Sequence, residues 1–542
     1  MPETVAFTCD GRAVQAPAGV TLAAALEALG AREGSAGGCA VLRRSVTGEP
    51  RGVLCAMGIC FECRVTIDGR PHRRACMEIV RAGMDVRTGE VEFAASSLES
   101  PGEERIDCDV AVVGGGPAGV AAACRAAEAG ARTVLLDEGA APGGQIYRHL
   151  PGREAPPAAR AWLARLAQSG AEIRAGASVF DAARTGASWR LLALGAGAGG
   201  VLAVSTRAIV LATGSRELFL PFPGWTLPGV YGAGGAQALW KSGAPLTGRT
   251  AVVGGSGPLL LPVAASLAKA GARVAAVVEQ AAFPALAAFV LSLGRSPSRI
   301  REAVRYRRGF AGTPYRTGTW IAEARGIGRL EGVVLADARG GRRELACDLA
   351  AVGWGLTPNT ELARLLGCAV ESGAVAVDGR QETGVPGVFC AGEACGVAGV
   401  EAAVAEGQIA GAAAAGRIAR LEDAWDRRLL ARARDRARAV AVRMHRSFRL
   451  RPELARLARE DTLVCRCEDV PLGALRACSG AREAKLAARA GMGPCQGRVC
   501  GPALAFLFGW DSDTVRTPVL PAALGALGFA PAERAPEEEG LG

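Results

Sequence analysis

The sequence predicts an α/β protein of several domains: a small strand-containing domain at the N-terminus, a large body of two doubly wound α/β units, and a small cysteine-bearing domain near the C-terminus. Three observations predict this arrangement. Two glycine-rich turns, near residues 114 and 255, each stand between an apolar strand and a helix, and strands alternate with helices from residue 108 to about 420. Patterned cysteines stand on both sides of that region.

Length and composition fit a chain with several packed cores. The chain has 542 residues, half of them hydrophobic, and a formal net charge of +10. The positive charge comes almost entirely from arginines scattered along the chain, because lysine occurs only at 241, 269 and 485. Scattered arginines favour a solvated surface over a phosphate-binding patch, so no nucleic-acid partner is expected.

The start of the chain carries no signal for export. The first residues, MPETVAFTCDGRAVQAP, lack a basic stretch followed by an apolar one, and no uninterrupted apolar run is long enough to cross a bilayer. We therefore expect a cytoplasmic protein that touches the inner face of a membrane at most peripherally. In a reducing compartment, its 17 cysteines favour metal ligation over a disulfide framework.

The N-terminal domain, residues 1–100, begins with two short strands joined by a turn at Asp10-Gly11. An apolar-periodic helix over 22–29 follows, with Thr21 as its N-cap and Gly30 just past its end. The stretch SSLESPGEER at 96–105 is rich in Ser, Glu, Pro and Gly, which is typical of a linker. A new domain is expected after it.

The strongest chemical signal is the segment RGVLCAMGICFECRVTIDGRPHRRACMEIV. It places Cys55, Cys60 and Cys63 on one glycine-containing loop, and Cys76 follows a hairpin turned at Asp68-Gly69. A CxxxxCxxC run with a distant fourth cysteine is the plant-type spacing for a [2Fe–2S] cluster, whose sulfurs loop amides can face. A structural zinc site also uses four cysteines, usually as two short CxxC knuckles, and it stays the alternative.

The first glycine-rich turn, in DVAVVGGGPAGVAAACRAAEAGARTVLLDE, predicts a dinucleotide site. Gly114 permits the tight turn, Gly116 lets the backbone approach the phosphates, and Gly119 lets helix and strand pack closely. The helix that follows, opened by Pro117-Ala118, offers positive potential to a pyrophosphate. Asp137 closes the next strand at the position of a ribose-hydroxyl acceptor.

The second glycine-rich turn, in TAVVGGSGPLLLPVAASLAKAGARVAAVVEQ, departs from that pattern. It offers Gly255 and Gly257, but Leu260 stands where a third glycine is expected and crowds the helix against the strand. A second nucleotide at this turn, with Glu279 as its ribose acceptor, is left open, and ordinary NAD(P)H binding is disfavoured. The chain is therefore expected to lack its own hydride donor.

A second cysteine set lies near the C-terminus. LVCRCEDV supplies Cys465 and Cys467, and GMGPCQGRVCG supplies Cys495 and Cys500. A CxC pair followed by a distant pair resembles the small helical [2Fe–2S] domain of bacterioferritin-associated ferredoxin, although that protein closes its second pair more tightly. We expect a second cluster here, with zinc and unligated core cysteines as the alternatives.

Two further segments resemble the two-dinucleotide-domain flavoprotein reductases. AIVLATGSRE contains Ala212-Thr213-Gly214, and ETGVPGVFCAGEACGVAGVEAAVAEGQIAG contains Gly392 and Glu393. In those reductases an ATG turn contacts the flavin domain, and a late strand ending in Gly-Asp places a carboxylate on the ribityl chain. The resemblance implies FAD, and Glu393 can accept the same hydrogen bonds as the usual aspartate.

Disulfide reductase chemistry is not expected. Such chemistry needs a redox-active thiol pair near the flavin. We expect no CxxC or CxxxxC pair beside either flavin-domain motif, because the residues after Pro142 read GGQIYR and contain no thiol.

Taken in order, the motifs resemble the bacterial heteromeric FAD-dependent amine and amino-acid dehydrogenases: D-hydroxyproline dehydrogenase, opine oxidase and hydrogen cyanide synthase, with kinship to the alpha subunit of sarcosine oxidase. The phrases PRGVLCAMGICFECRVTIDG, PGGQIYR, GSGPLLL and GMGPCQGRVCG carry the resemblance. It implies that the ferredoxin-like (gamma) and FAD/NAD-binding (alpha) subunits are fused here, with Gly144 and Gln145 at the FAD. It also implies a missing partner, a separate FAD-dependent subunit of the amino-acid-oxidase type. The sequence specifies neither the amine nor the electron acceptor.

The resemblance completes the fold prediction: an N-terminal β-grasp ferredoxin-like domain, a three-layer ββα Rossmann-like reductase fold, and a small C-terminal helical [2Fe–2S] domain. The expected domains are, in order, 1–100 (2Fe–2S ferredoxin-like), 106–235 (FAD-binding, first part), 236–350 (inserted, NAD(P)-like), 351–420 (FAD-binding, second part), 421–460 (helical linker), 461–515 (bacterioferritin-associated-ferredoxin-like) and 516–542 (tail). The last residues, APAERAPEEEGLG, are expected to be disordered. The apolar segment 281–294 is expected to be core, with a partner-facing or membrane-touching surface as the alternative.

The sequence leaves three functions open. Cluster sites beside an FAD site favour an electron-transfer subunit of a flavin-dependent amine or amino-acid dehydrogenase. The second nucleotide unit motivates the alternative, a self-sufficient NAD(P)H-dependent reductase. In the third, both cysteine sets hold zinc and serve only assembly. No acid–base constellation for oxidising a C–N bond stands out, since histidine occurs only at 72, 149 and 445.

Overall fold

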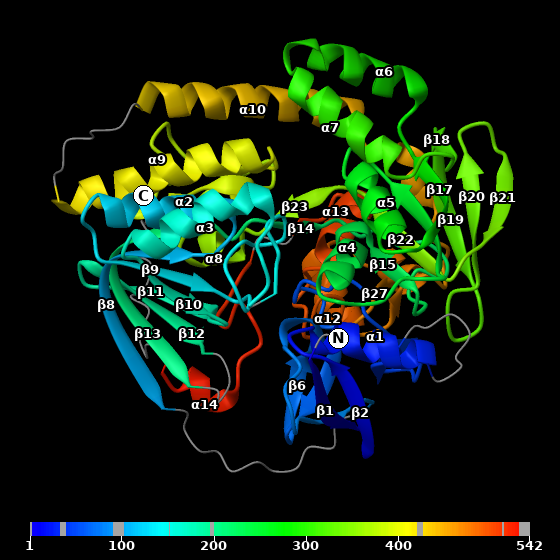
Figure 1. Ribbon diagram of the computed structural model, residues 1–542, viewed down its shortest axis with the longest axis horizontal. Coiled ribbons are helices and arrows are strands. Elements are labelled where there is room, and N and C mark those ends of the chain that lie inside the picture. Colours follow the sequence, from blue (N-terminus) through cyan, green and yellow to red (C-terminus); the bar gives the residue numbers. More distant parts are fainter. Residues whose placement is uncertain are drawn as a thin grey trace.

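The computed structural model describes residues 3–32, 40–89, 102–150, 152–195, 200–419, 427–511 and 514–529. Its architecture confirms the predicted fold class, with a small N-terminal sheet domain, two Rossmann-like units side by side and a small C-terminal helical part (Figure 1). The first residues of the expected linker, 96–101, and the expected disordered tail, 530–542, lie outside the described residues.

The N-terminal domain is a five-stranded sheet in the order β2-β1-β7-β5-β6. Its strands are β1 (Thr4–Cys9), β2 (Arg12–Pro17), β5 (Arg64–Ile67), β6 (Arg70–Arg74) and β7 (Asp85–Arg87). Both expected hairpin turns form, with Asp10 and Asp68 at positive φ. The Thr21 hydroxyl accepts from the Ala24 amide at 3.3 Å and caps α1 (Leu22–Arg32). This helix continues past Gly30, because one glycine costs a helix only about 1 kcal/mol.

The first nucleotide unit is a seven-stranded sheet in the order β10-β9-β8-β13-β12-β11, with β26 beside β13. Its strands are β8 (Glu103–Val113), β9 (Thr133–Asp137), β10 (Glu172–Ala175), β11 (Ser178–Thr185), β12 (Ser188–Leu194), β13 (Val201–Leu211) and β26 (Val388–Cys390). Helices α2 (Pro117–Glu128), α3 (Pro157–Gln168) and α9 (Val400–Ala419) pack on it. Because β26 follows the second unit in the chain but pairs with β13, the second unit is inserted between strands of the first sheet.

The second unit is a parallel five-stranded sheet in the order β15-β22-β16-β17-β18, flanked by a three-stranded sheet β19-β20-β21. The strands are β15 (Val230–Gly232), β16 (Thr250–Gly255), β17 (Arg273–Glu279), β18 (Tyr315–Thr317), β19 (Thr319–Arg325), β20 (Gly332–Asp337), β21 (Arg342–Ala346) and β22 (Leu349–Gly353). Its helices include α4 (Ala233–Lys241), α5 (Leu260–Lys269) and α7 (Pro297–Arg308). A ladder of β14 (Ser215–Glu217) and β23 (Leu356–Pro358) joins it to the first unit.

Helix α6 (Phe283–Ser292) lies at the rim of the second unit and is mostly exposed. Only Phe289 is buried within it, whereas Phe283 is 67% and Leu291 81% exposed. The expectation that 281–294 is core is therefore wrong for most of this helix. The physical reason is that α6 packs against α10 through Phe289, whose ring meets that of Phe448, just past the end of α10, edge to face at 5.3 Å.

The C-terminal part begins with α10 (Arg427–Ser447), which runs across α9 towards α6 and spans both nucleotide units (Figure 1). A small domain follows, made of β27 (Leu463–Cys465), β28 (Val470–Pro471), α11 (Leu472–Arg476), α12 (Ala481–Ala488) and α13 (Cys500–Phe508). Helix α14 (Leu524–Leu527) returns to the first sheet, where Ala526 packs with Phe180.

The remaining elements are short. They are β3 (Arg43–Arg44), β4 (Pro50–Arg51), β24 (Val370–Glu371), β25 (Ala374–Val375), α8 (Glu361–Leu365), and the 3-10 helices η1 (Ala75–Met77), η2 (Leu293–Arg295), η3 (Gly392–Cys395) and η4 (Pro452–Arg456). None of the helices in the described part of the chain combines the length and the apolar character that crossing a membrane requires.

Candidate redox site

A cavity of about 500 Å³ opens where the first nucleotide unit meets the N-terminal and C-terminal domains. Most of the residues that the sequence predicts for FAD line it: Gly114, Gly116, Pro117, Ala118, Asp137, Gly144, Gln145, Ala212, Thr213, Gly214, Gly392 and Glu393. Gly119 lies behind the turn, in the contact between α2 and β8. These residues come from five segments, at 114–118, 137, 144–145, 212–214 and 392–393, which thus converge on one space.

The turn after β8 has the shape that a dinucleotide requires. Gly114 has a positive φ, and a Cβ there would overlap the Ala212 carbonyl oxygen. A Cβ on Gly119 would overlap the Gly114 carbonyl oxygen, so only glycine allows α2 to pack this closely. A Cβ on Gly116 would meet no protein atom within 4 Å, because this position faces the open cavity. The N-terminus of α2 therefore presents bare backbone to the cavity, which fits a pyrophosphate.

Two half-buried carboxyl groups, those of Asp137 and Glu393, stand in the cavity wall. Asp137 accepts hydrogen bonds from the Gly115 amide and, at 2.8 Å, from the Gly139 amide. Glu393 accepts a hydrogen bond from the Ser215 hydroxyl. Burial raises the pKa of both carboxyl groups. Both can accept from the hydroxyl groups of a ribose or a ribityl chain.

Three arginines of the wall were not singled out from the sequence. Arg148 donates to the Ala56 carbonyl at 2.7 Å and so ties the wall to the first cysteine loop. Arg216 pairs with Glu361 at 2.8 Å and donates at 3.1 Å to the carbonyl of Arg498, which lies between Cys495 and Cys500. Arg148 and Arg498 stand in PGGQIYR and GMGPCQGRVCG, two phrases that carry the family resemblance. Arg216 stands in AIVLATGSRE, the segment that resembles the flavoprotein reductases.

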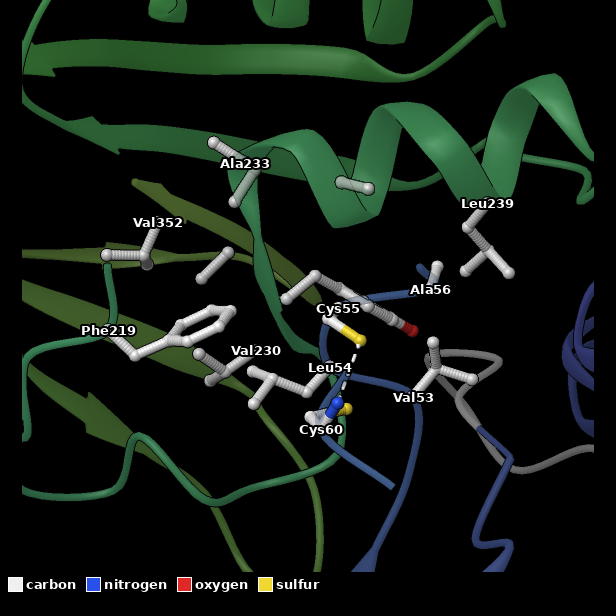
Figure 2. Packing of buried hydrophobic residues seen from close by; sticks show 14 of the residues in the cluster. Val53, Leu54, Cys55, Ala56, Cys60, Phe219, Val230, Ala233, Leu239 and Val352 are labelled. Carbon is white, nitrogen blue, oxygen red and sulfur yellow. Dashed lines mark hydrogen bonds between the residues drawn. The ribbon is translucent and has the colours of Figure 1, made fainter. Parts of the chain in front are cut away.

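The first cysteine set is buried and contacts the cavity. Cys55, Cys60, Cys63 and Cys76 are each at most 3% exposed, and Cys76 itself lines the cavity. The Cys55 loop packs against α4 through Leu54, and the Cys60 amide donates to the Cys55 sulfur at 3.4 Å (Figure 2). Burial raises the pKa of Cys55, but hydrogen bonds from the Cys60 thiol and from loop amides outweigh it and lower that pKa to about 6.

The second cysteine set is also buried, and its thiols are also in contact. Cys465, Cys467, Cys495 and Cys500 are buried, and the Cys467 and Cys495 sulfurs lie 3.4 Å apart. A hydrogen bond from the Cys500 thiol and several backbone amides lower the pKa of Cys465 to about 6, against the effect of burial. Each set therefore contains one thiol that is ready to ligate as a thiolate.

The thiols of both sets meet in pairs. Cys55 contacts Cys60 and Cys63 contacts Cys76, and in the second set Cys465 contacts Cys500. No three His, Cys, Asp or Glu side chains of the described residues surround a single metal position. In a [2Fe–2S] cluster each iron takes two protein thiolates, so the pairing fits two irons better than one four-thiolate zinc ion.

A CxxxxC pair does exist beside a flavin-domain motif, contrary to the sequence expectation. Cys390 and Cys395 flank Gly392 and Glu393, and their thiols are in contact. Both face the core behind the cavity, and the contact with Cys395 together with burial raises the pKa of Cys390 well above its usual value. The pair is a contact within the core, and the expectation that disulfide chemistry is absent now rests on the orientation of this pair.

The second glycine-rich turn is covered by the chain itself. Glu279 is fully buried and accepts from the Gly257 amide at 2.7 Å and the Ala281 amide at 2.8 Å; burial raises its pKa to about 7. The Ser256 hydroxyl donates to the Phe448 carbonyl at 3.0 Å. Gln280 donates to the Arg449 carbonyl at 3.2 Å. The predicted residues Gly255, Gly257 and Glu279 therefore lie together at one turn, under the segment 448–451.

Comparison with known families identifies the two large parts of the chain. A model described as a 2Fe-2S iron-sulfur cluster binding domain matches residues 2–90, and a model described as pyridine nucleotide-disulphide oxidoreductase matches residues 108–414. The chain belongs to the pyridine nucleotide-disulphide oxidoreductase family. As a member of that family it is an FAD-dependent oxidoreductase, and its N-terminal domain binds a 2Fe–2S cluster.

Among proteins of this family, the chain is 33% identical over 473 residues to a subunit of opine oxidase from Rhizobium meliloti, covering 77% of this chain and 97% of the relative. It is 34% identical over 445 residues to the HcnB subunit of hydrogen cyanide synthase from Pseudomonas aeruginosa, covering 75% of this chain and 92% of that subunit. It is also 43% identical over 84 residues to the HcnA subunit of the same organism, covering 16% of this chain and 73% of that subunit. One polypeptide here thus joins parts that resemble two separate subunits.

A solved structure shares the whole fold of this oxidoreductase. L-proline dehydrogenase from P. horikoshii aligns over 97% of this chain and 98% of its own, with a TM-score of 0.67 and 21% identity. At that identity the likeness concerns the fold, including the C-terminal part that the two family models do not cover.

Proposed function

We propose that this chain is the electron-transfer subunit of a heteromeric dehydrogenase that acts on CH–NH or CH–NH2 donors. A separate FAD-dependent chain of the amino-acid-oxidase type oxidises the amine, which belongs to the class of D-hydroxyproline, opines or glycine. The similarity to the opine oxidase and hydrogen cyanide synthase chains, both named as subunits, supports an assembly of several chains. One observation carries the proposal: Cys76 of the first cysteine set and Arg498, which lies between two cysteines of the second set, both line the cavity of the FAD motif.

The proposed role needs little acid–base chemistry from this chain. Bound FAD accepts or releases electron pairs, which iron–sulfur centres take up one at a time. The chain's own residues hold and separate these groups. Asp137 and Glu393 offer acceptors to the ribose and ribityl hydroxyls. Arg148 links the cavity wall to the first cysteine loop, and the Arg216–Glu361 pair holds the second loop against the cavity.

A second [2Fe–2S] cluster in the C-terminal cysteine set belongs to this proposal. Its support is the paired arrangement of four buried thiols and the amide donors around Cys465. The nearby cation Arg498 is buried and makes a hydrogen bond with the Val519 carbonyl. An anionic centre between buried amides and a guanidinium group is electrostatically favourable.

The alternative, a self-sufficient NAD(P)H-dependent reductase, has less support. Its nicotinamide nucleotide would bind at the second glycine-rich turn. There Glu279 already accepts from two backbone amides, and Ser256 and Gln280 hold the segment 448–451 over the turn. A nucleotide would have to displace this segment, and the same cost applies to any other second nucleotide at that turn.

The purified chain tests both functions in one preparation. We expect one FAD, four irons and four acid-labile sulfides per chain, and no reduction of the flavin on anaerobic addition of an amino acid or an amine. NADH and NADPH should leave the flavin spectrum unchanged, while dithionite should bleach it. Reduction by the amine should appear only after the amine-oxidising chain is added.

Two results would overturn the proposal. Robust turnover of an amine by the isolated chain would show that no separate oxidising subunit is needed. Rapid bleaching of the flavin by NADH or NADPH would favour the reductase. Zinc in place of iron in the C-terminal set would remove the second cluster and leave the N-terminal one in place.

A further inference from the structure

A buried ion pair connects the two cysteine loops directly. Glu62 lies between Cys60 and Cys63, and Arg466 lies between Cys465 and Cys467. The Arg466 Nε donates to the Glu62 Oε1 at 2.7 Å, although the two residues are 404 positions apart in the sequence. The side chains are 3% and 1% exposed. Each partner of the pair is therefore flanked in sequence by the proposed ligands of a different cluster.

A second buried pair continues the contact. Arg51 and Asp469 meet at 2.7 Å with side chains 2% and 1% exposed, and the Thr47 hydroxyl donates to Asp469 at 2.6 Å. The Arg466 guanidinium also lies 4.8 Å from the Trp225 ring centroid and donates to the Trp225 carbonyl at 2.8 Å. The Trp225 indole donates to the Leu463 carbonyl at 2.7 Å. The two loops are thus fixed to each other and to the second nucleotide unit.

The network carries an excess of positive charge. Glu62 also pairs with Arg43 at 2.6 Å, so three arginines face two carboxylates in the network of Arg43, Arg51, Glu62, Arg466 and Asp469. Arg43 lies within electrostatic reach of Cys60 in one set and Cys467 in the other. The Nε groups of Arg43 and Arg51 have no hydrogen-bond partner within the described protein. Buried cations need compensation, and a cluster with four thiolates and two sulfides is an anion.

We propose that the Glu62–Arg466 pair holds the two cysteine sets side by side, so that the two [2Fe–2S] clusters form one electrostatically and magnetically coupled pair. This inference rests on the proposed function, because it needs a cluster in the C-terminal set. Glu62 and Arg466 are positioning residues, since the cysteines remain the ligands. A single electron passes between the two sets without any bond being formed or broken and without transfer of a proton.

The unaltered protein gives the first test. The full chain is reduced with dithionite until both clusters hold one unpaired electron, and its electron paramagnetic resonance spectrum is recorded. Two spins held close together split or broaden each other's signal. We expect this interaction in the fully reduced protein and its loss at half reduction. In a redox titration, reduction of one cluster should lower the midpoint potential of the other.

Two variants separate the shared pair from an ordinary neighbouring charge. Glu62→Gln removes a negative charge that faces both sets, so both midpoint potentials should shift upward. Glu468→Gln is the matched control, because Glu468 follows Cys467 directly but pairs outward with Arg489 at 2.7 Å. This control should shift only the potential of the C-terminal cluster. If Glu62→Gln fails to fold, the spin interaction in the unaltered protein still decides the question.

The outcomes distinguish the inference from the function on which it rests. Four irons per chain with no spin interaction, and potentials that titrate independently, would overturn the coupling and leave the proposed function standing. A Glu62→Gln shift confined to one cluster would also overturn it. Two irons per chain would remove the second cluster, and the inference would fall with it.

Discussion

Replacement of Gly116 by alanine is expected to weaken FAD binding while leaving the fold nearly intact. Gly116 is the N-cap of α2 and has a φ of −70°, which alanine adopts without strain. A Cβ at this position meets no protein atom within 4 Å. The added methyl group therefore points into the cavity, where the pyrophosphate is predicted to approach the backbone. The cost to the apoprotein is that of a poorer N-cap, about 0.5–1 kcal/mol.

The loss of affinity can be worked out from one hydrogen bond. A methyl group at Gly116 holds the phosphate away from the amides at the start of α2, and a hydrogen bond to a charged group contributes about 1.5–3 kcal/mol. Since about 1.4 kcal/mol corresponds to a tenfold change, the Kd for FAD should rise roughly 10- to 150-fold. Quenching of flavin fluorescence on titration into apoprotein measures that constant.

Gly119→Ala is the matched control for the same turn. Its Cβ would overlap the Gly114 carbonyl oxygen, so α2 has to move away from β8. Overpacking of this kind costs about 1–3 kcal/mol. The midpoint temperature of thermal unfolding of the apoprotein should therefore fall clearly in Gly119→Ala and hardly change in Gly116→Ala. An unchanged FAD constant in Gly116→Ala would refute the assignment of this cavity to the pyrophosphate.

Three further predictions address the rest of the site and the fold. Cys467→Ser should halve the iron and sulfide content of the chain. Cys478 lies outside both cysteine sets, so Cys478→Ser should leave that content unchanged. Equal losses in the two variants would contradict the assignment of Cys467 as a cluster ligand. Burial raises the pKa of Glu27 from 4.5 to about 7, so the folded chain holds a proton that the unfolded chain releases, and the free energy of unfolding falls as the pH rises through that window. Glu27→Gln should remove this fall and stabilise the protein by about 1–3 kcal/mol at pH 8 in urea unfolding, with no gain at pH 4.5. Glu393→Ala should weaken FAD binding by about 1.5–3 kcal/mol, while Glu393→Asp should retain most of it, as equilibrium dialysis would show.

The parts of the site that could be predicted are those whose geometry is local. The turn at Gly114 and the CxxxxCxxC loop each lie within one short segment, so spacing alone indicates the chemistry. The hairpin turns at Asp10 and Asp68 were predictable for the same reason, since they depend on a few neighbouring residues. The family resemblance added the late flavin segment at Gly392 and Glu393, which no local rule would connect with the first turn.

The parts that could not be predicted depend on contacts between distant segments. The Glu62–Arg466 pair joins residues 404 positions apart, and neither residue belongs to a charge pattern in its own segment. The exposure of α6 could not be read from its apolar composition, because burial depends on which helices pack beside it. The CxxxxC pair at Cys390 and Cys395 was visible in the sequence, but only its orientation decides whether it faces the flavin cavity.

The second nucleotide unit keeps the form of a dinucleotide site while residues of its turn bind other parts of the chain. β16, α5 and β17 retain the strand–turn–helix–strand order of a dinucleotide site, yet Glu279 binds the backbone of its own turn and Ser256 holds Phe448. The same unit supports the cluster loops, since α4 packs against the Cys55 loop (Figure 2). A nucleotide at this turn would have to displace the segment 448–451, to which Ser256 and Gln280 donate hydrogen bonds. Under the proposed function, this unit holds the two cysteine loops in a constant position beside the flavin cavity, which electron transfer requires.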